Sequence, residues 1–125
     1  MMGEIGVRYR YSDVSGILDY VTRMIEDGRV VAINGEKGIH AVLFYAICHD
    51  WHPFHEKGSW IYLAHDPQGD TIYLESLVSK GWDKEVRAKF EEIITHKYPN
   101  LKEAVWHRWA KDGDRAVKIQ RRLYV

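Results

Sequence analysis

The segment CHDWHPFH holds the densest group of side chains that could do chemistry. His49, His52 and His55 follow one another at intervals of three residues, beside a cysteine and an aspartate. Imidazole, thiolate and carboxylate groups are the ligands through which proteins bind zinc and other first-row metals. His49 and His52 would share a face of a helix, but Pro53 disfavours a helix at this point. We therefore expect an irregular segment over Cys48–Ser59. Its histidines lie in water or at the rim of a cleft, bind a metal ion, or supply His49 as a base near neutral pH.

A second feature is the turn Ser79–Gly81, which separates a predicted strand from a predicted helix. The strand, Ile72–Val78, is rich in β-branched, aromatic and aliphatic residues. A glycine-containing turn ahead of a helix can point free backbone N–H groups at an anionic ligand, although ordinary packing of a strand against a helix explains the same pattern. The apolar stripe that predicts the helix consists of Trp82, Val86, Phe90, Ile93 and Ile94, with Asp83 as its cap and Pro99-Asn100 as its end.

The remaining elements follow from alternating or helical periodicity and from turn residues. Apolar residues at helical spacing predict a helix over Val14–Ile25, capped by Ser12-Asp13 and ended by Gly28. A helix over Arg115–Leu123 is the alternative to the last strand. The other predicted strands are Glu4–Tyr11, Val30–Asn34 and Ile39–Ile47 joined as a hairpin by Gly35–Gly38, Trp60–Ala64, Ala104–Trp109, and a final one over Val117–Val125. The order predicts an α+β fold: one domain over 1–125 with a single mixed, mostly antiparallel sheet and two main helices.

Composition narrows the class of protein. The chain has 125 residues, 46% of them hydrophobic, and a formal net charge of zero, so nothing attracts nucleic acid or an anionic membrane overall. One cysteine, no signal-peptide pattern and no apolar run longer than Ala41–Cys48 predict a soluble, cytoplasmic protein. Basic residues between aromatic ones near the C-terminus fit protection of an edge strand better than binding of nucleic acid. The many aromatic residues are compatible with a homodimer.

Two stretches resemble parts of a known superfamily. The hairpin VVAINGEKGIHAVLFYAI, and IYLESLVSKGW with the helix and AVWHRW after it, resemble the strands, loop and helix of the GNAT superfamily of acyl-CoA-dependent N-acyltransferases. The lack of that superfamily's usual fourth helix is closer to the toxin-activating lysine acyltransferases, a divergent branch. Short phage-encoded GNAT-like proteins are a further comparison.

The resemblance implies a site and a reaction. It implies that acetyl-CoA or another acyl-CoA donates its acyl group to an amine, on a small molecule or a protein lysine. Glu75 falls where the superfamily places a general base, and a histidine such as His49 would act in the toxin-activating branch. The superfamily's phosphate loop reads roughly Q/R-x-x-G-x-G/A, and here Gly81 is its single glycine. Because the loop has a single glycine, the alternative is a non-catalytic GNAT-like binding or structural protein, such as a phage-encoded one. A second alternative is a metal-binding protein that uses the loop with His49, His52 and His55. The cofactor-binding residues that the resemblance implies are Leu77, Val78, Ser79, Lys80, Gly81, Trp82 and Lys84.

Overall fold

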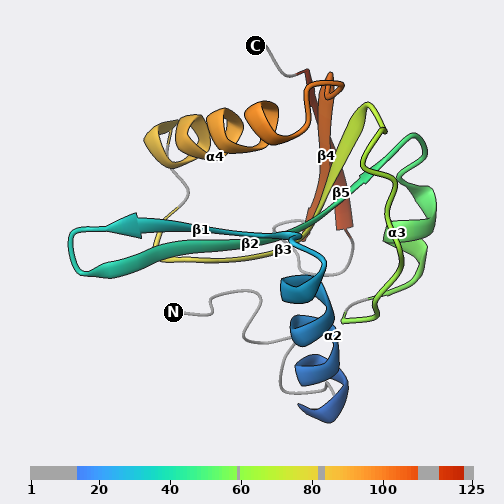
Figure 1. Cartoon of the computed structure of the whole chain (residues 1–125), viewed down its shortest axis with the longest axis horizontal. Coiled ribbons are helices and arrows are strands. Elements are labelled where there is room, and N and C mark those ends of the chain that lie inside the picture. The colour runs from blue at the N-terminus through green and yellow to red at the C-terminus, as the bar shows by residue number, and fades with distance from the viewer. Residues whose placement is uncertain (1–13, 59, 82–83, 110–115, 123–125) are drawn as a thin grey trace.

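The computed structural model describes residues 14–58, 60–81, 84–109 and 116–122 (Figure 1). The predicted strand Glu4–Tyr11 and the predicted caps Ser12-Asp13 and Asp83 lie outside these residues. No helix in the described part of the chain is long and apolar enough to cross a membrane. The elements, in chain order, are α2 (Val14–Glu26), β1 (Val30–Gly35), β2 (Gly38–Cys48), α3 (His52–Glu56), β3 (Thr71–Ser79), α4 (Lys84–Lys97), β4 (Glu103–Trp109) and β5 (Ala116–Arg122).

The strands form one five-stranded sheet in the order β1-β2-β3-β4-β5. Neighbouring strands are antiparallel except β3 and β4, which are parallel and are connected through α4. The prediction of a single mixed, mostly antiparallel sheet with two main helices is therefore confirmed. The last element is the predicted strand, not the alternative helix, because β5 pairs with β4 from Glu103↔Arg122 to Trp109↔Ala116.

Strand β2 carries core residues on both faces, because successive side chains of a strand point in opposite directions. Figure 1 shows α4 on one side of the sheet and α2 on the other. The face toward α4 contains Ala41, Leu43, Tyr45 and Ile47, which share a core with Val86, Phe90 and Ile94 of α4. On the other face, Phe44 packs with Tyr20 and Met24 of α2, and Ala46 and Cys48 pack with Phe54 of α3.

Two sequence-based predictions between β2 and β3 are wrong. Cys48–Ser59 is not irregular throughout, since α3 occupies His52–Glu56 with Pro53 in its first turn. A proline is accommodated there because the first N–H groups of a helix have no partner within the helix. Trp60–Ala64 does not form a strand either. Trp60 has a φ of 64°, which breaks an extended conformation at its first residue.

Candidate functional site

Strands β3 and β4 separate partway along their length. Their pairing runs from Thr71↔Glu103 to Leu74↔Trp106, although β3 goes on to Ser79 and β4 to Trp109. A β-bulge lies on β3 at the same level, because Phe44 pairs with Ser76 while Tyr45 pairs with Leu74. Figure 1 shows β4 and β5 turning away from β1, β2 and β3. The far half of β3 thus presents one backbone edge to an opening between the two strands.

Glu75 is the extra residue of the bulge, and its carboxylate is buried in an ion network. Its side chain is 4% exposed and lies 2.9 Å, Oε2 to Nη2, from Arg29, which is completely buried. The other carboxylate oxygen forms an ion pair with Lys57, without the alignment of a hydrogen bond. Both oxygens of Glu75 are therefore engaged by cations. To accept a proton from a substrate, this carboxylate would have to give up one of these contacts.

Arg29 connects four segments of the chain through its guanidinium group. Its Nε donates to the carbonyl of Tyr45 at 2.9 Å, and its Nη1 donates to the carbonyl of Leu63 at 2.8 Å and to Asp27 at 3.1 Å. Although partial burial opposes it, hydrogen bonds from Arg29 and Tyr62 lower the pKa of the Asp27 carboxyl. This network fixes the bulge relative to the end of α2 and the loop before β3.

The turn after β3 is held by His40. The N–H of Lys80 donates to the backbone carbonyl of His40 at 3.0 Å, and Nε2 of His40 lies 3.0 Å from the carbonyl oxygen of Gly81. A Cβ atom at Gly81 would lie 3.8 Å from that imidazole, which is an ordinary contact. Lys84 begins α4 three positions after Gly81, and Trp82 lies outside the described residues.

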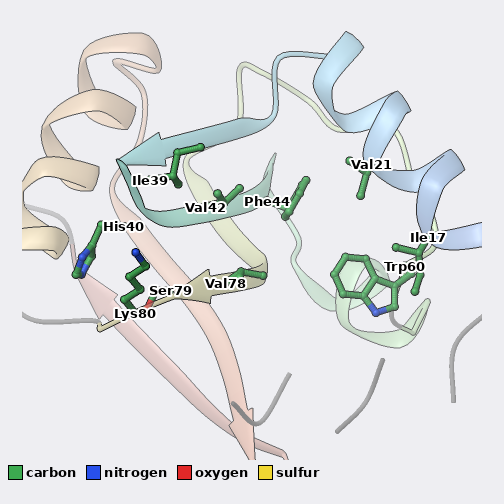
Figure 2. A pocket seen from close by; sticks show the side chains of 10 residues that line it. All are labelled: Ile17, Val21, Ile39, His40, Val42, Phe44, Trp60, Val78, Ser79 and Lys80. Atoms are coloured by element: carbon green, nitrogen blue, oxygen red, sulfur yellow. The ribbon is translucent and has the colours of Figure 1, made fainter. Parts of the chain in front are cut away.

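A cavity of about 430 Å³ adjoins this turn on the α2 face of the sheet (Figure 2). Three of the predicted cofactor-binding residues, Val78, Ser79 and Lys80, form one end of its wall. Leu77 points to the other face, where it packs against the core under α4. The rest of the lining is mainly apolar: Ile17 and Val21 of α2, Ile39, His40, Val42 and Phe44 of β2, and Trp60.

Trp60 forms part of the wall of this cavity in a conformation that costs free energy. Its φ of 64° is in the left-handed region, which costs a residue other than glycine roughly 1–2 kcal/mol. Edge-to-face contacts with Tyr20 and Phe44, at centroid distances of 5.4 and 6.4 Å, offset part of that cost. The indole is thereby fixed as one wall between α2 and β2.

The structure does not bring the two predicted catalytic residues together. His49 is exposed and lies 3.5 Å from Asp66 and 3.9 Å from Asp70, measured between ring nitrogens and carboxylate oxygens. It follows Cys48, which pairs with Thr71 at the start of β3. Glu75 is four residues further along that strand, or about 13 Å at the rise of an extended chain.

The three histidines of the predicted metal loop contact different partners. His49 faces the two aspartates just named, while His52 donates to Asp50 at 2.6 Å, which lowers the pKa of that carboxyl. His55 lies instead 3.0 Å from the hydroxyl of Tyr73. Among the residues that the structure describes, no group of three or more such side chains is arranged to hold a metal ion.

Tyr73 and His107 form, with His55, a cluster that the sequence analysis did not predict. The hydroxyl of Tyr73 also lies 3.1 Å from Nδ1 of His107. These two histidines are 52 positions apart in the sequence, and neither spacing nor periodicity connects them. Their approach depends on the parallel register of β3 and β4 and on the place of α3, which no local pattern reveals.

Comparison with known proteins gives a structural likeness but no match in sequence. No protein-family model matches the chain, and no curated protein matches it in sequence. Among solved structures it is similar to GphF, a GNAT-like decarboxylase in complex with isobutyryl-CoA, at 18% identity and a TM-score of 0.47. The match covers 80% of this chain and 54% of that one, so the chain spans about half the length of the solved structure.

Proposed function

We propose that this protein binds an acyl-CoA in the opening between β3 and β4 and transfers the acyl group to an amine. The observation that carries the proposal is the separation of the two parallel strands at the bulge, after Leu74↔Trp106. The pantetheine arm of CoA is an extended chain with two amide groups. Such a chain can pair with a free strand edge as an added strand does, and the edge of β3 over Ser76–Ser79 has the required form.

The turn at the far end of β3 supports the same orientation of the ligand. It precedes the N-terminus of α4, where backbone N–H groups and the helix dipole favour phosphate groups. Lys80 and Lys84, both exposed, add positive charge on either side of the turn. The phosphates would therefore lie at the turn, and the thioester would lie toward the bulge at Glu75.

The chemistry requires few side chains. An amine nitrogen attacks the thioester carbon, and backbone N–H groups near Leu77 and Val78 would stabilise the charge on the carbonyl oxygen. Glu75 is the proposed base, acting directly or through water. The two cations beside it favour a second candidate, in which the same site binds an acyl-CoA without transferring its acyl group. His49 lies at the other end of β3, and its catalytic role stays a prediction.

Thermal unfolding with and without acetyl-CoA and longer acyl-CoAs tests the proposal. A ligand at 100 times its dissociation constant stabilises the native state by about 2.7 kcal/mol. For 125 residues the unfolding entropy is roughly 0.26 kcal/mol per kelvin, so the midpoint should rise by roughly 10 °C. No rise with any acyl-CoA at millimolar concentration would refute binding. Release of the CoA thiol in the presence of amines then separates transfer from binding alone.

Two substitutions at one position locate the ligand. Gly81→Glu places a negative charge at the turn, and Gly81→Gln is its neutral control of equal size. Neither is strained at the Cβ atom, which meets only the imidazole of His40 at 3.8 Å. We expect the glutamate variant to lose the rise in midpoint and the glutamine variant to keep most of it. Equal rises in both variants would place the phosphates elsewhere.

A further inference from the structure

The hydroxyl of Tyr73 is shared by two imidazoles. Nδ1 of His55 and Nδ1 of His107 lie 3.0 and 3.1 Å from the same oxygen. The two rings stack on each other, with their centroids 3.7 Å apart and their planes 18° from parallel. Trp51 lies beside them, its ring centroid 5.4 Å from that of His107 and 6.3 Å from that of Tyr73. The indole therefore shields one side of the shared hydroxyl from water.

The cluster leads from the opening to solvent. Trp106 is the last residue of β4 that pairs with β3, so His107 is the first residue of β4 at the opening. Tyr73 is 5% exposed and lies behind it, while His55 on α3 is exposed. A proton taken up at the opening can therefore reach water through three groups in sequence.

The geometry constrains where the protons are. A phenol has one proton to donate, so at most one imidazole nitrogen accepts from it, and the other must itself donate to the phenol oxygen. The two neutral rings then carry their protons on different nitrogens.

Among the side chains that the structure describes, the other ionisable groups near the cluster do not disturb this arrangement. Burial, with the charge of Asp50, raises the pKa of the Cys48 thiol to about 12, so this neighbour from β2 stays neutral. Lys57, which follows α3, and Glu75 of β3 compensate each other in an ion pair. His52 of α3 points to Asp50 instead.

We propose that His107, Tyr73 and His55 form a proton relay that serves the acyl transfer, an inference that rests on the proposed function. Glu75 takes the proton of the ammonium form before the attack. As the amine nitrogen then bonds to the thioester carbon and the carbon–sulfur bond breaks, the second amine proton passes to Nε2 of His107. The Nδ1 proton of His107 passes to the oxygen of Tyr73, whose own proton passes to Nδ1 of His55. His55 releases its Nε2 proton to water, and water protonates the departing thiolate.

Long-range ¹H–¹⁵N NMR spectra of the imidazoles test the relay without any substrate. We expect the wild-type protein near neutral pH to show His55 protonated on Nε2 and His107 on Nδ1. Tyr73→Phe keeps the ring and removes the hydroxyl, so it should abolish this difference in tautomer between the two histidines. Signals are assigned from His55→Gln and His107→Gln. Wild-type rings that share one tautomer, or a pattern unchanged by Tyr73→Phe, would overturn the relay whether or not the protein binds acyl-CoA.

Turnover supplies the second measurement, with CoA thiol release as the signal and primary amines as acceptors. Tyr73→Phe should lower kcat on the order of 10²-fold and move the acid limb of its pH profile, with KM for acyl-CoA unchanged. Tyr45→Phe is the matched control, because it removes another largely buried hydroxyl, bonded to Gly28 and Tyr98 on the α4 face. Undiminished kcat in Tyr73→Phe would overturn the relay and leave the transferase intact. Absence of acyl-CoA binding would end the proposed function and, with it, the role of the relay in transfer, while the NMR spectra would still decide whether the chain of hydrogen bonds exists.

Discussion

Replacing Arg29 with methionine should destabilise the protein more than the same replacement of an exposed arginine. The guanidinium is completely buried and donates to Asp27, Glu75 and two backbone carbonyls. Methionine fills most of the same volume but leaves the carbonyls without their donor and removes the cation that compensates Glu75. Removing one partner of a buried ion pair costs about 3–5 kcal/mol.

Chemical denaturation and calorimetry measure this effect. With an unfolding entropy of roughly 0.26 kcal/mol per kelvin for 125 residues, the midpoint should fall by roughly 10–20 °C. The matched control is Arg23→Met on α2, whose ion pair with Asp19 is long, at 3.9 Å, and exposed. That control should change stability by less than about 1 kcal/mol.

A double-mutant cycle with Glu75→Gln isolates the pair itself. The amide oxygen of glutamine still accepts from Arg29, so the single substitution should cost less than Arg29→Met. We expect a coupling energy on the order of 1–3 kcal/mol between the two sites. The reasoning is refuted if Arg29→Met costs no more than Arg23→Met, because the network would then not hold the bulge in place.

Three further predictions concern groups outside the opening. The thiol of Cys48, with its pKa raised to about 12 by burial, should react with an alkylating reagent only after denaturation; rapid reaction of the native protein would contradict its burial. Burial and the charge of Arg29 lower the pKa of His65, whose Nδ1 accepts from the N–H of Ile47, so stability should be full above pH 6.5 and fall as the pH drops below it; denaturation of His65→Gln should show a flatter profile. Gly69→Ala should cost about 1–3 kcal/mol because its Cβ would lie 2.4 Å from the carbonyl oxygen of Cys48; equal denaturation midpoints for wild type and variant would contradict that contact.

The elements that the sequence predicted correctly are those with local signals. The hairpin Val30–Cys48 follows from two apolar runs around a short glycine-bounded turn, and the helices follow from their apolar stripes. These signals act within a few residues. They therefore predict these elements without knowledge of contacts to distant parts of the chain.

The features that the sequence did not reveal depend on partners far along the chain. In the sequence, Arg29 follows Gly28 and resembles part of a polar link between a helix and a strand. It is buried because it pairs with Glu75, which lies 46 positions away in sequence and 2.9 Å away in space. The segment after Trp60 does not pair as a strand. Its backbone makes single hydrogen bonds instead, among them the one that the carbonyl of Leu63 accepts from Arg29. The site is in this sense a product of tertiary packing.

The short parallel seam between β3 and β4 has a mechanical consequence. Its few paired residues join two antiparallel units that are each held by much longer rows of hydrogen bonds. The angle between these units is therefore the softest coordinate of the sheet, and the last pair, Leu74 and Trp106, acts as its pivot. The side chains of Leu74 and Trp106 are partly buried against the core under α4, so their size sets the angle between the two antiparallel units. The width of the opening between β3 and β4 can thus be changed by substitutions at Leu74 and Trp106, which need not touch a ligand.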